Sequence, residues 1–240
     1  MYKGFKIKPP FFELGPKAYL YGEASLKLAL EADRIAQKYD VNIIYTPQYV
    51  DIPVIAREVK YINIFAQHMD PVVVGRGIGS VLPESLKAAG ATGTLLNHAE
   101  KKMTLSGILK AIKRADEVGL ATIVCADNLT EALSIAQMHP NIILAEPESQ
   151  VGKQQNDISS RNYIKEINEK VKAIDPDIHI LHSAGIYSGK DVYDIISIGA
   201  EATGCTSGVI KADDPVKVLE EMIFSLRKAW DERANKENLK

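Results

Sequence analysis

The fold is decided by the stretch ATIVCADNLTEALSIAQMHPNIILAE, residues 121–146. It opens with an uninterrupted apolar run, ATIVCA, and closes with a second one, NIILAE. Between the two runs, residues 129–138 place Leu129, Ala132 and Leu133 at helical spacing. Two short apolar runs joined by an amphipathic helix are typical of parallel strands connected by a crossover, because parallel strands need a connection of this length.

The same alternation continues in both directions along the chain. Strands are predicted over residues 11–14, 41–47, 62–67, 92–97, 121–126, 141–146, 178–183 and, more weakly, 201–207. Helices are predicted over residues 23–39, 83–89, 104–118, 129–138, 162–174, 191–198 and 214–233. About eight strand–helix units in 240 residues favour an α/β fold, a single (β/α)₈ barrel domain over residues 1–240, with an open doubly wound sheet as the competitor. The charged tail, residues 234–240, is expected to fray.

Composition restricts the class of protein. The formal charge of -2 gives no basic footprint for nucleic acid, and no run approaches the ~18 apolar residues of a membrane span. The N-terminus lacks an apolar stretch of signal-peptide length. Cys125 and Cys205 lie in separate strand-like runs, which suits a reducing, cytoplasmic location better than a disulfide framework.

In a parallel barrel the reactive groups follow the carboxyl ends of the strands. Glu146 ends one strand and is a candidate base, because a dry barrel mouth raises the pKa of a carboxyl group. His98 is a candidate electrophile or proton shuttle, although it could also be a buried histidine with one hydrogen bond and no catalytic role. Lys17 is a candidate cation, although it could also be an ordinary surface lysine. The loops after the last two strands suit a phosphate group, and they hold Ser183, Gly185, Thr206, Ser207 and Gly208.

Several longer segments together resemble the triosephosphate isomerase family, in particular its shorter archaeal-type branch. The segments are PKAY (16–19), SVLPESLKAAGATGTLLNH (80–98), LLNHAEKK (95–102), LAEPESQVG (144–152), AGI (184–186) and SGVIKADDP (207–215). The resemblance extends from about Pro10 to about Lys228. It implies a TIM barrel and a cofactor-independent, metal-free aldose–ketose isomerase that acts on a small phosphorylated sugar.

The resemblance also implies a role for each site residue. Glu146 would move a proton between adjacent carbons, His98 would act as a neutral imidazole on the two oxygens of the enediolate, and Lys17 would supply charge, oriented by Glu100. Backbone N–H groups of Gly152, Gly185, Ser207 and Gly208 would hold the phosphate, and residues 148–153 would form a closing lid. The segment QHMDPVVVGRGIGSV, residues 67–81, resembles an interface loop and predicts a homodimer or homotetramer.

The chain departs from the family pattern at four places. Gly15 and Pro16 stand where the family has an asparagine and its neighbour, Ala99 replaces a serine, and Lys153-Gln154 replaces part of the lid hinge. His182 and Ser183 replace smaller residues. A missing asparagine removes an amide donor to the substrate and would leave space for a fourth carbon, so a tetrulose phosphate such as erythrulose phosphate is an alternative to the triose phosphates.

Two further alternatives come from other classes of protein. One is a phosphosugar-binding protein without turnover, which the joint presence of Lys17, His98 and Glu146 disfavours. The other is a metal-dependent epimerase or aldolase that uses His68, Asp70 and His182, whose spacing is not a ligand signature.

Overall fold

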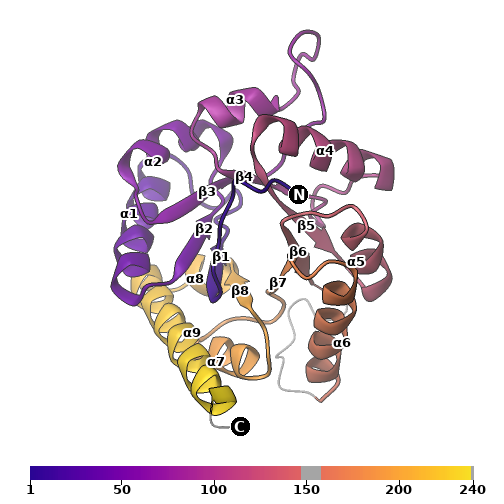
Figure 1. Ribbon diagram of the computed structural model, residues 1–240. Helices are drawn as coiled ribbons and strands as arrows, with labels where there is room; N and C mark the ends of the chain where they lie inside the picture. Colours follow the sequence, from indigo (N-terminus) through magenta and orange to yellow (C-terminus); the bar gives the residue numbers. More distant parts are fainter. Residues whose placement is uncertain (147–157, 239–240) are drawn as a thin grey trace.

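Eight parallel strands close into a barrel in chain order, with helices on the outside (Figure 1). The computed structural model describes residues 1–146 and 158–238. The strands are β1 (Phe11–Leu14), β2 (Asn42–Tyr45), β3 (Ile62–Ala66), β4 (Gly93–Leu96), β5 (Ala121–Ala126), β6 (Ile142–Ala145), β7 (His179–His182) and β8 (Ala202–Cys205). The barrel is closed by β1, which pairs with both β2 and β8. The predicted (β/α)₈ barrel is confirmed, and the open sheet is wrong.

The helices follow the predicted pattern with local differences. They are α1 (Gly22–Tyr39), the 3₁₀ turn η1 (Tyr49–Asp51), α2 (Ile52–Glu58), α3 (Pro83–Ala88), α4 (Leu105–Val118), α5 (Leu129–Ala136), α6 (Ile158–Ile174), α7 (Gly189–Ser197), α8 (Ser207–Ile210) and α9 (Pro215–Asn238). The short elements η1, α2 and α8 were not predicted. Helix α9 continues to Asn238, so it includes residues 234–238 of the tail that was expected to fray. Within the described residues, no helix has the length and apolar character needed to cross a bilayer.

Strand alternation divides the core into two parts. Phe12 and Leu14 of β1 point outward and pack in the large cluster between the strands and the helices. Phe11 points inward and packs with Ile44, Phe65 and other side chains inside the barrel. The next inward positions of the same strand are Glu13 and, just beyond its end, Gly15, so these two lie toward the carboxyl-terminal mouth.

The barrel packs closely around Gly93 of β4. A Cβ atom there would lie 2.4 Å from the ring of Phe65 and 2.7 Å from the carbonyl oxygen of Ala121. We therefore expect Gly93→Ala to lower the free energy of unfolding by about 1–3 kcal/mol, because neither neighbour can move without disturbing a paired strand. Urea unfolding measures this change, and an unchanged midpoint and slope would contradict it.

Candidate active site

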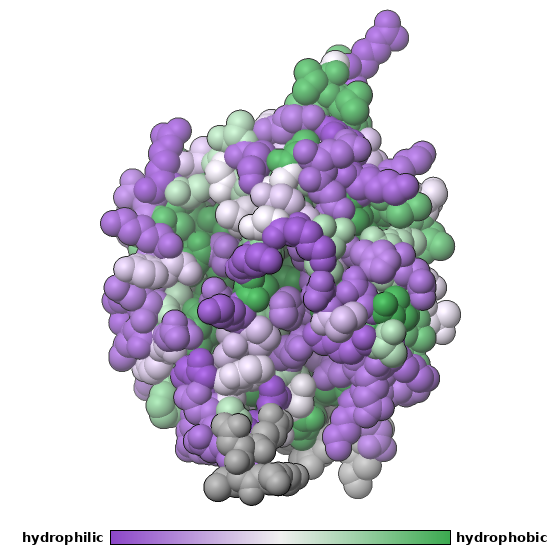
Figure 2. Space-filling view, viewed as in Figure 1, coloured by the Kyte–Doolittle hydropathy of each residue, from purple (hydrophilic) through white to green (hydrophobic). Residues whose placement is uncertain are grey.

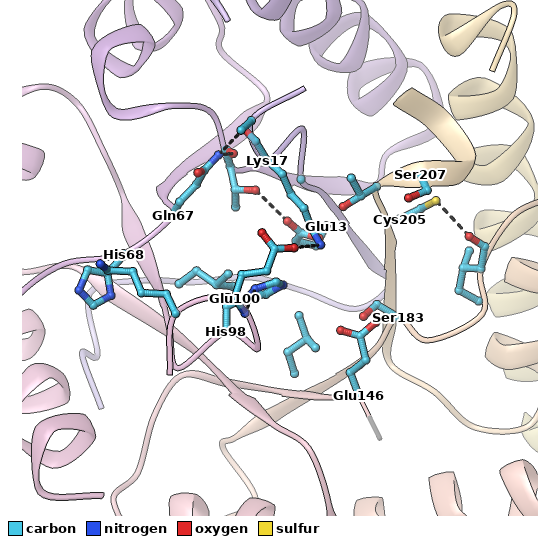
Figure 3. A pocket seen from close by; sticks show the side chains of 18 of the residues that line it. Glu13, Lys17, Gln67, His68, His98, Glu100, Glu146, Ser183, Cys205 and Ser207 are labelled. Atoms are coloured by element: carbon cyan, nitrogen blue, oxygen red, sulfur yellow. Dashed lines mark hydrogen bonds and ion pairs between the residues drawn. The ribbon is translucent and has the colours of Figure 1, made fainter. Parts of the chain in front are cut away.

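One cavity at the mouth of the barrel collects most of the predicted site residues (Figure 3). Its volume is about 350 Å³. The predicted residues that line it are Gly15, Lys17, His98, Glu100, Glu146, Ser183, Gly185, Thr206 and Ser207. They follow β1, β4, β6, β7 and β8, so the fold brings together groups that are more than a hundred residues apart in the sequence.

Glu146 follows β6 and is held in place by its backbone N–H, which donates to the carbonyl oxygen of Ala126 at 3.0 Å. Burial raises the pKa of the Glu146 carboxyl above its ordinary value, whereas the charge of Lys17 and a hydrogen bond from Ser183 lower it in part. Ser183 therefore contacts the carboxyl group as well as lining the predicted phosphate loop. A carboxylate with a raised pKa is a better proton acceptor than an exposed one.

His98 lies in the tight turn that follows β4. The backbone N–H of Glu100 donates to its Nδ1 atom at 3.1 Å, so this nitrogen carries no proton and a neutral ring has its proton on Nε2. Burial and the nearby charge of Lys17 lower the pKa of His98, which favours the same neutral form. The donor to the ring is a turn N–H and not a helix N-terminus, since α4 begins only at Leu105.

Lys17 is fixed through both its backbone and its side chain. Its φ angle of 51° is left-handed, which is uncommon for a residue with a side chain. Its carbonyl oxygen accepts hydrogen bonds from the amide groups of Gln48 at 2.8 Å and Gln67 at 2.9 Å. Its Nζ atom donates to Glu100 Oε1 at 2.7 Å. The ion pair is largely exposed, so it orients the lysine more than it stabilises the fold.

Three residues of the site were missed by the sequence reasoning. Gln48 and Gln67 follow β2 and β3 and donate to the carbonyl oxygen of Lys17, and Gln67 also donates to the carbonyl oxygen of Thr46; no motif marks such a role. Glu13 lies in a strand that was read as simply apolar, although a charged residue inside FFEL was a usable signal. It is 8% exposed and lines the cavity.

One predicted phosphate ligand, Gly208, stands apart from the cavity, and a second, Gly152, lies outside the described residues. Gly208 does not line the cavity; a Cβ there would lie 2.9 Å from Cys205 Sγ and from Tyr187 Cα, so packing at the start of α8 requires glycine. Gly152, the lid (148–153) and the altered hinge at Lys153 and Gln154 lie outside the described residues.

The residues considered for a metal centre are not brought together. His68 pairs with Asp70 through Nε2 at 3.2 Å, whereas His182 points away from the mouth and pairs with Asn168 of α6 at 3.0 Å. Residues 1–146 and 158–238 contain no group of three or more His, Cys, Asp or Glu side chains that could hold a metal ion. The three residues named for a metal-dependent enzyme therefore do not form one site.

His182 instead predicts a pH-dependent stability. Burial lowers its pKa from 6.5 to about 4. Between these values the unfolded chain binds the proton that the folded chain excludes, so the free energy of unfolding decreases as the pH falls from 6.5 to 4, by on the order of 3 kcal/mol. Denaturant titrations from pH 4 to pH 7 should show a flatter dependence of the free energy of unfolding on pH for His182→Gln than for the wild type. Equal slopes for His182→Gln and the wild type would contradict this assignment.

The chain is similar to known proteins along most of its length. The family model described as triosephosphate isomerase matches residues 17–222. The triosephosphate isomerase of Methanobacterium bryantii is 39% identical over 225 residues, which cover 90% of this chain and 97% of that protein. That of Methanothermus fervidus is 38% identical over 206 residues (85% and 92%), and that of Sulfurisphaera tokodaii 34% identical over 235 residues (95% and 100%).

Proposed function

This chain belongs to the triosephosphate isomerase family, and from that premise we propose that it interconverts dihydroxyacetone phosphate and glyceraldehyde 3-phosphate through an enediolate. The observation that carries the proposal is the meeting of Glu146, His98 and Lys17 in one cavity at the barrel mouth. A base, a neutral proton donor and a cation are the three groups that this proton transfer needs.

Each group has a distinct task in the proposed reaction. Glu146 removes a proton from the carbon next to the carbonyl group and returns it to the neighbouring carbon, which exchanges ketose for aldose without loss of atoms. His98 donates its Nε2 proton to one oxygen of the enediolate and recovers a proton from the other. Lys17 places a positive charge beside the developing oxyanion. The backbone at Gly185 and Ser207 faces the same cavity and suits the phosphate group.

A four-carbon ketose phosphate is the alternative substrate. It depended on free space at position 15, but a Cβ atom there would lie 2.8 Å from Glu13 Oε1 and 3.0 Å from Thr46 Oγ1. Side chains already occupy that place, which favours the triose phosphates. Turnover should be measured with glyceraldehyde 3-phosphate and with both enantiomers of erythrulose phosphate. Fast turnover of the triose phosphate supports the proposal. Faster turnover of a tetrulose phosphate would assign that sugar as the substrate, and no turnover of any of them would overturn the assignment as an enzyme.

We also propose that the protein forms at least a dimer in the cytoplasm. The segment between β3 and α3 projects from the barrel (Figure 1), and apolar side chains gather on it just below its hydrophilic end (Figure 2). Val73 and Val74 are 65% and 71% exposed, and Ile78 is fully exposed. Exposed apolar groups gathered on one projection suit a protein interface. Light scattering that finds only a 26.4 kDa species would refute the dimer.

A further inference from the structure

Glu13 is a buried carboxyl group that the reaction described so far does not use. It points into the barrel from β1, one layer above the apolar side chain of Phe11, and forms part of the cavity that holds Glu146 and Lys17 (Figure 3). Burying a carboxyl group costs free energy unless its oxygens are hydrogen-bonded. Its hydrogen bonds therefore decide whether it is only structural.

One of its two oxygens is satisfied and the other is left to the cavity. The hydroxyl group of Thr46 donates to Glu13 Oε1 at 2.9 Å. Within the described part of the chain, no group forms a hydrogen bond with Oε2. Thr46 thus fixes the orientation of the carboxyl group, and Oε2 is the oxygen that remains for a bound ligand.

Two glycines make room for this carboxyl group. A Cβ atom at Gly15 would lie 2.8 Å from Glu13 Oε1, and a Cβ atom at Gly204 of β8 would lie 3.1 Å from Oε2 and 2.8 Å from the Glu13 carbonyl oxygen. Gly15 is the position at which the family pattern has an asparagine. The Glu13 carboxyl group therefore stands where the side chain of residue 15 would begin.

The surroundings of Glu13 favour its neutral form. Burial raises the pKa of Glu13 to about 7, the nearby Glu146 carboxylate adds to the rise, and the hydrogen bond from Thr46 and the charge of Lys17 oppose it. A neutral carboxylic acid that accepts on one oxygen carries its proton on the other. It can then donate a hydrogen bond, as an asparagine amide does.

We propose that Glu13 is a further substrate-binding residue, whose Oε2–H donates a hydrogen bond to an oxygen at the reacting end of the sugar phosphate in place of the side chain that position 15 lacks. The inference rests on the proposed isomerase function, because it needs a substrate oxygen beside Glu146 and Lys17. It assigns Thr46 as the positioning residue of this donor.

The first test is the pH profile of kcat/KM with glyceraldehyde 3-phosphate. In the wild type the contribution of Glu13 is present below pH 7 and is lost as the pH rises through about 7, because the acid loses the proton that it donates. Glu13→Gln keeps a donor at every pH, so it should remain within about threefold of the wild type at pH 6 and lack that loss. Glu13→Val should be about 10- to 100-fold slower at pH 6. Glu201→Gln, a carboxyl group at the opposite end of the barrel, is the control.

The second test is a double-mutant cycle on shared space. Gly15→Asn alone should lower activity, because its side chain meets the Glu13 carboxyl group. Glu13→Ala alone should also lower it, since the donor is lost. The pair Glu13→Ala with Gly15→Asn should be more active than either single variant, because the amide takes the vacated place. Additive losses would overturn the proposal.

The outcomes separate this inference from the proposed function. If the wild type turns over no faster than Glu146→Gln, the isomerase assignment fails, and the role of Glu13 fails with it. If the wild type is active while Glu13→Val has the same activity and pH profile, only the role of Glu13 is overturned. If Glu13→Val does not fold, Glu13→Gln still decides. A Glu13→Gln variant whose kcat/KM falls above pH 7 just as that of the wild type does would contradict a role for Glu13 as a titrating donor.

Discussion

Replacing Glu146 by glutamine is expected to lower kcat by about 10²- to 10⁴-fold, the range that a positioned general base contributes. The amide keeps the shape of the side chain but takes up no proton. The neighbouring groups remain, so substrate should still bind while deuterium exchange at its carbon ceases. NMR in D₂O measures the exchange, and a coupled assay measures kcat.

The control for this prediction is Glu169→Gln, the same change at an exposed position of α6, which should leave kcat unaltered. Activity of Glu146→Gln within tenfold of the wild type would show that another group is the base. The wild-type profile adds an independent check. Because burial raises the pKa of Glu146, kcat/KM should fall as the pH decreases through a value above the ordinary one for glutamate.

Replacing Lys17 by methionine is expected to lower kcat by about 10²- to 10³-fold, because it removes the charge that faces the developing oxyanion and keeps most of the side-chain length. The same charge lowers the pKa of Glu146. In Lys17→Met the pKa of Glu146 should therefore rise, and the fall of kcat/KM on the acidic side of its pH profile should begin at a higher pH. A loss of rate caused only by disturbed packing would leave this fall at the same pH.

Lys113→Met, on the exposed face of α4, is the matched control and should change neither rate nor profile. The free energy of unfolding should differ little between Lys17→Met and the wild type, because the ion pair with Glu100 is exposed to solvent. A Lys17→Met protein with wild-type kcat would contradict the proposed role.

The sequence predicted the barrel, and the meeting of Lys17, His98 and Glu146 at its mouth, because both follow from the order of the strands. Apolar runs alternate with amphipathic helices, and the polar residues that end the runs converge when the strands are parallel. The helix α2 escaped prediction because it is short and has a proline in its first turn, and α8 because Ser207 begins a helix directly after a strand. In these places the tertiary environment decides the local structure.

Glu13 and the two glutamines show why the sequence did not predict the whole site. Glu13 fits into the cavity because Gly15, just beyond the end of β1, and Gly204 of β8 leave room for its carboxyl group. Gln48 and Gln67 act on the backbone of a residue at least 31 positions away. Such relations depend on strand register and loop conformation, which residue spacing along one chain does not specify.

The left-handed backbone at Lys17 has an entropic consequence. Such a conformation costs on the order of 1–3 kcal/mol in a residue other than glycine, and ordering a lysine side chain costs about 2 kcal/mol more. In a free loop these costs would recur each time an anionic ligand ordered the residue. Here Gln48, Gln67 and Glu100 hold it before any ligand arrives, so the loss of chain entropy occurs once, when the protein folds, and does not weaken each binding event.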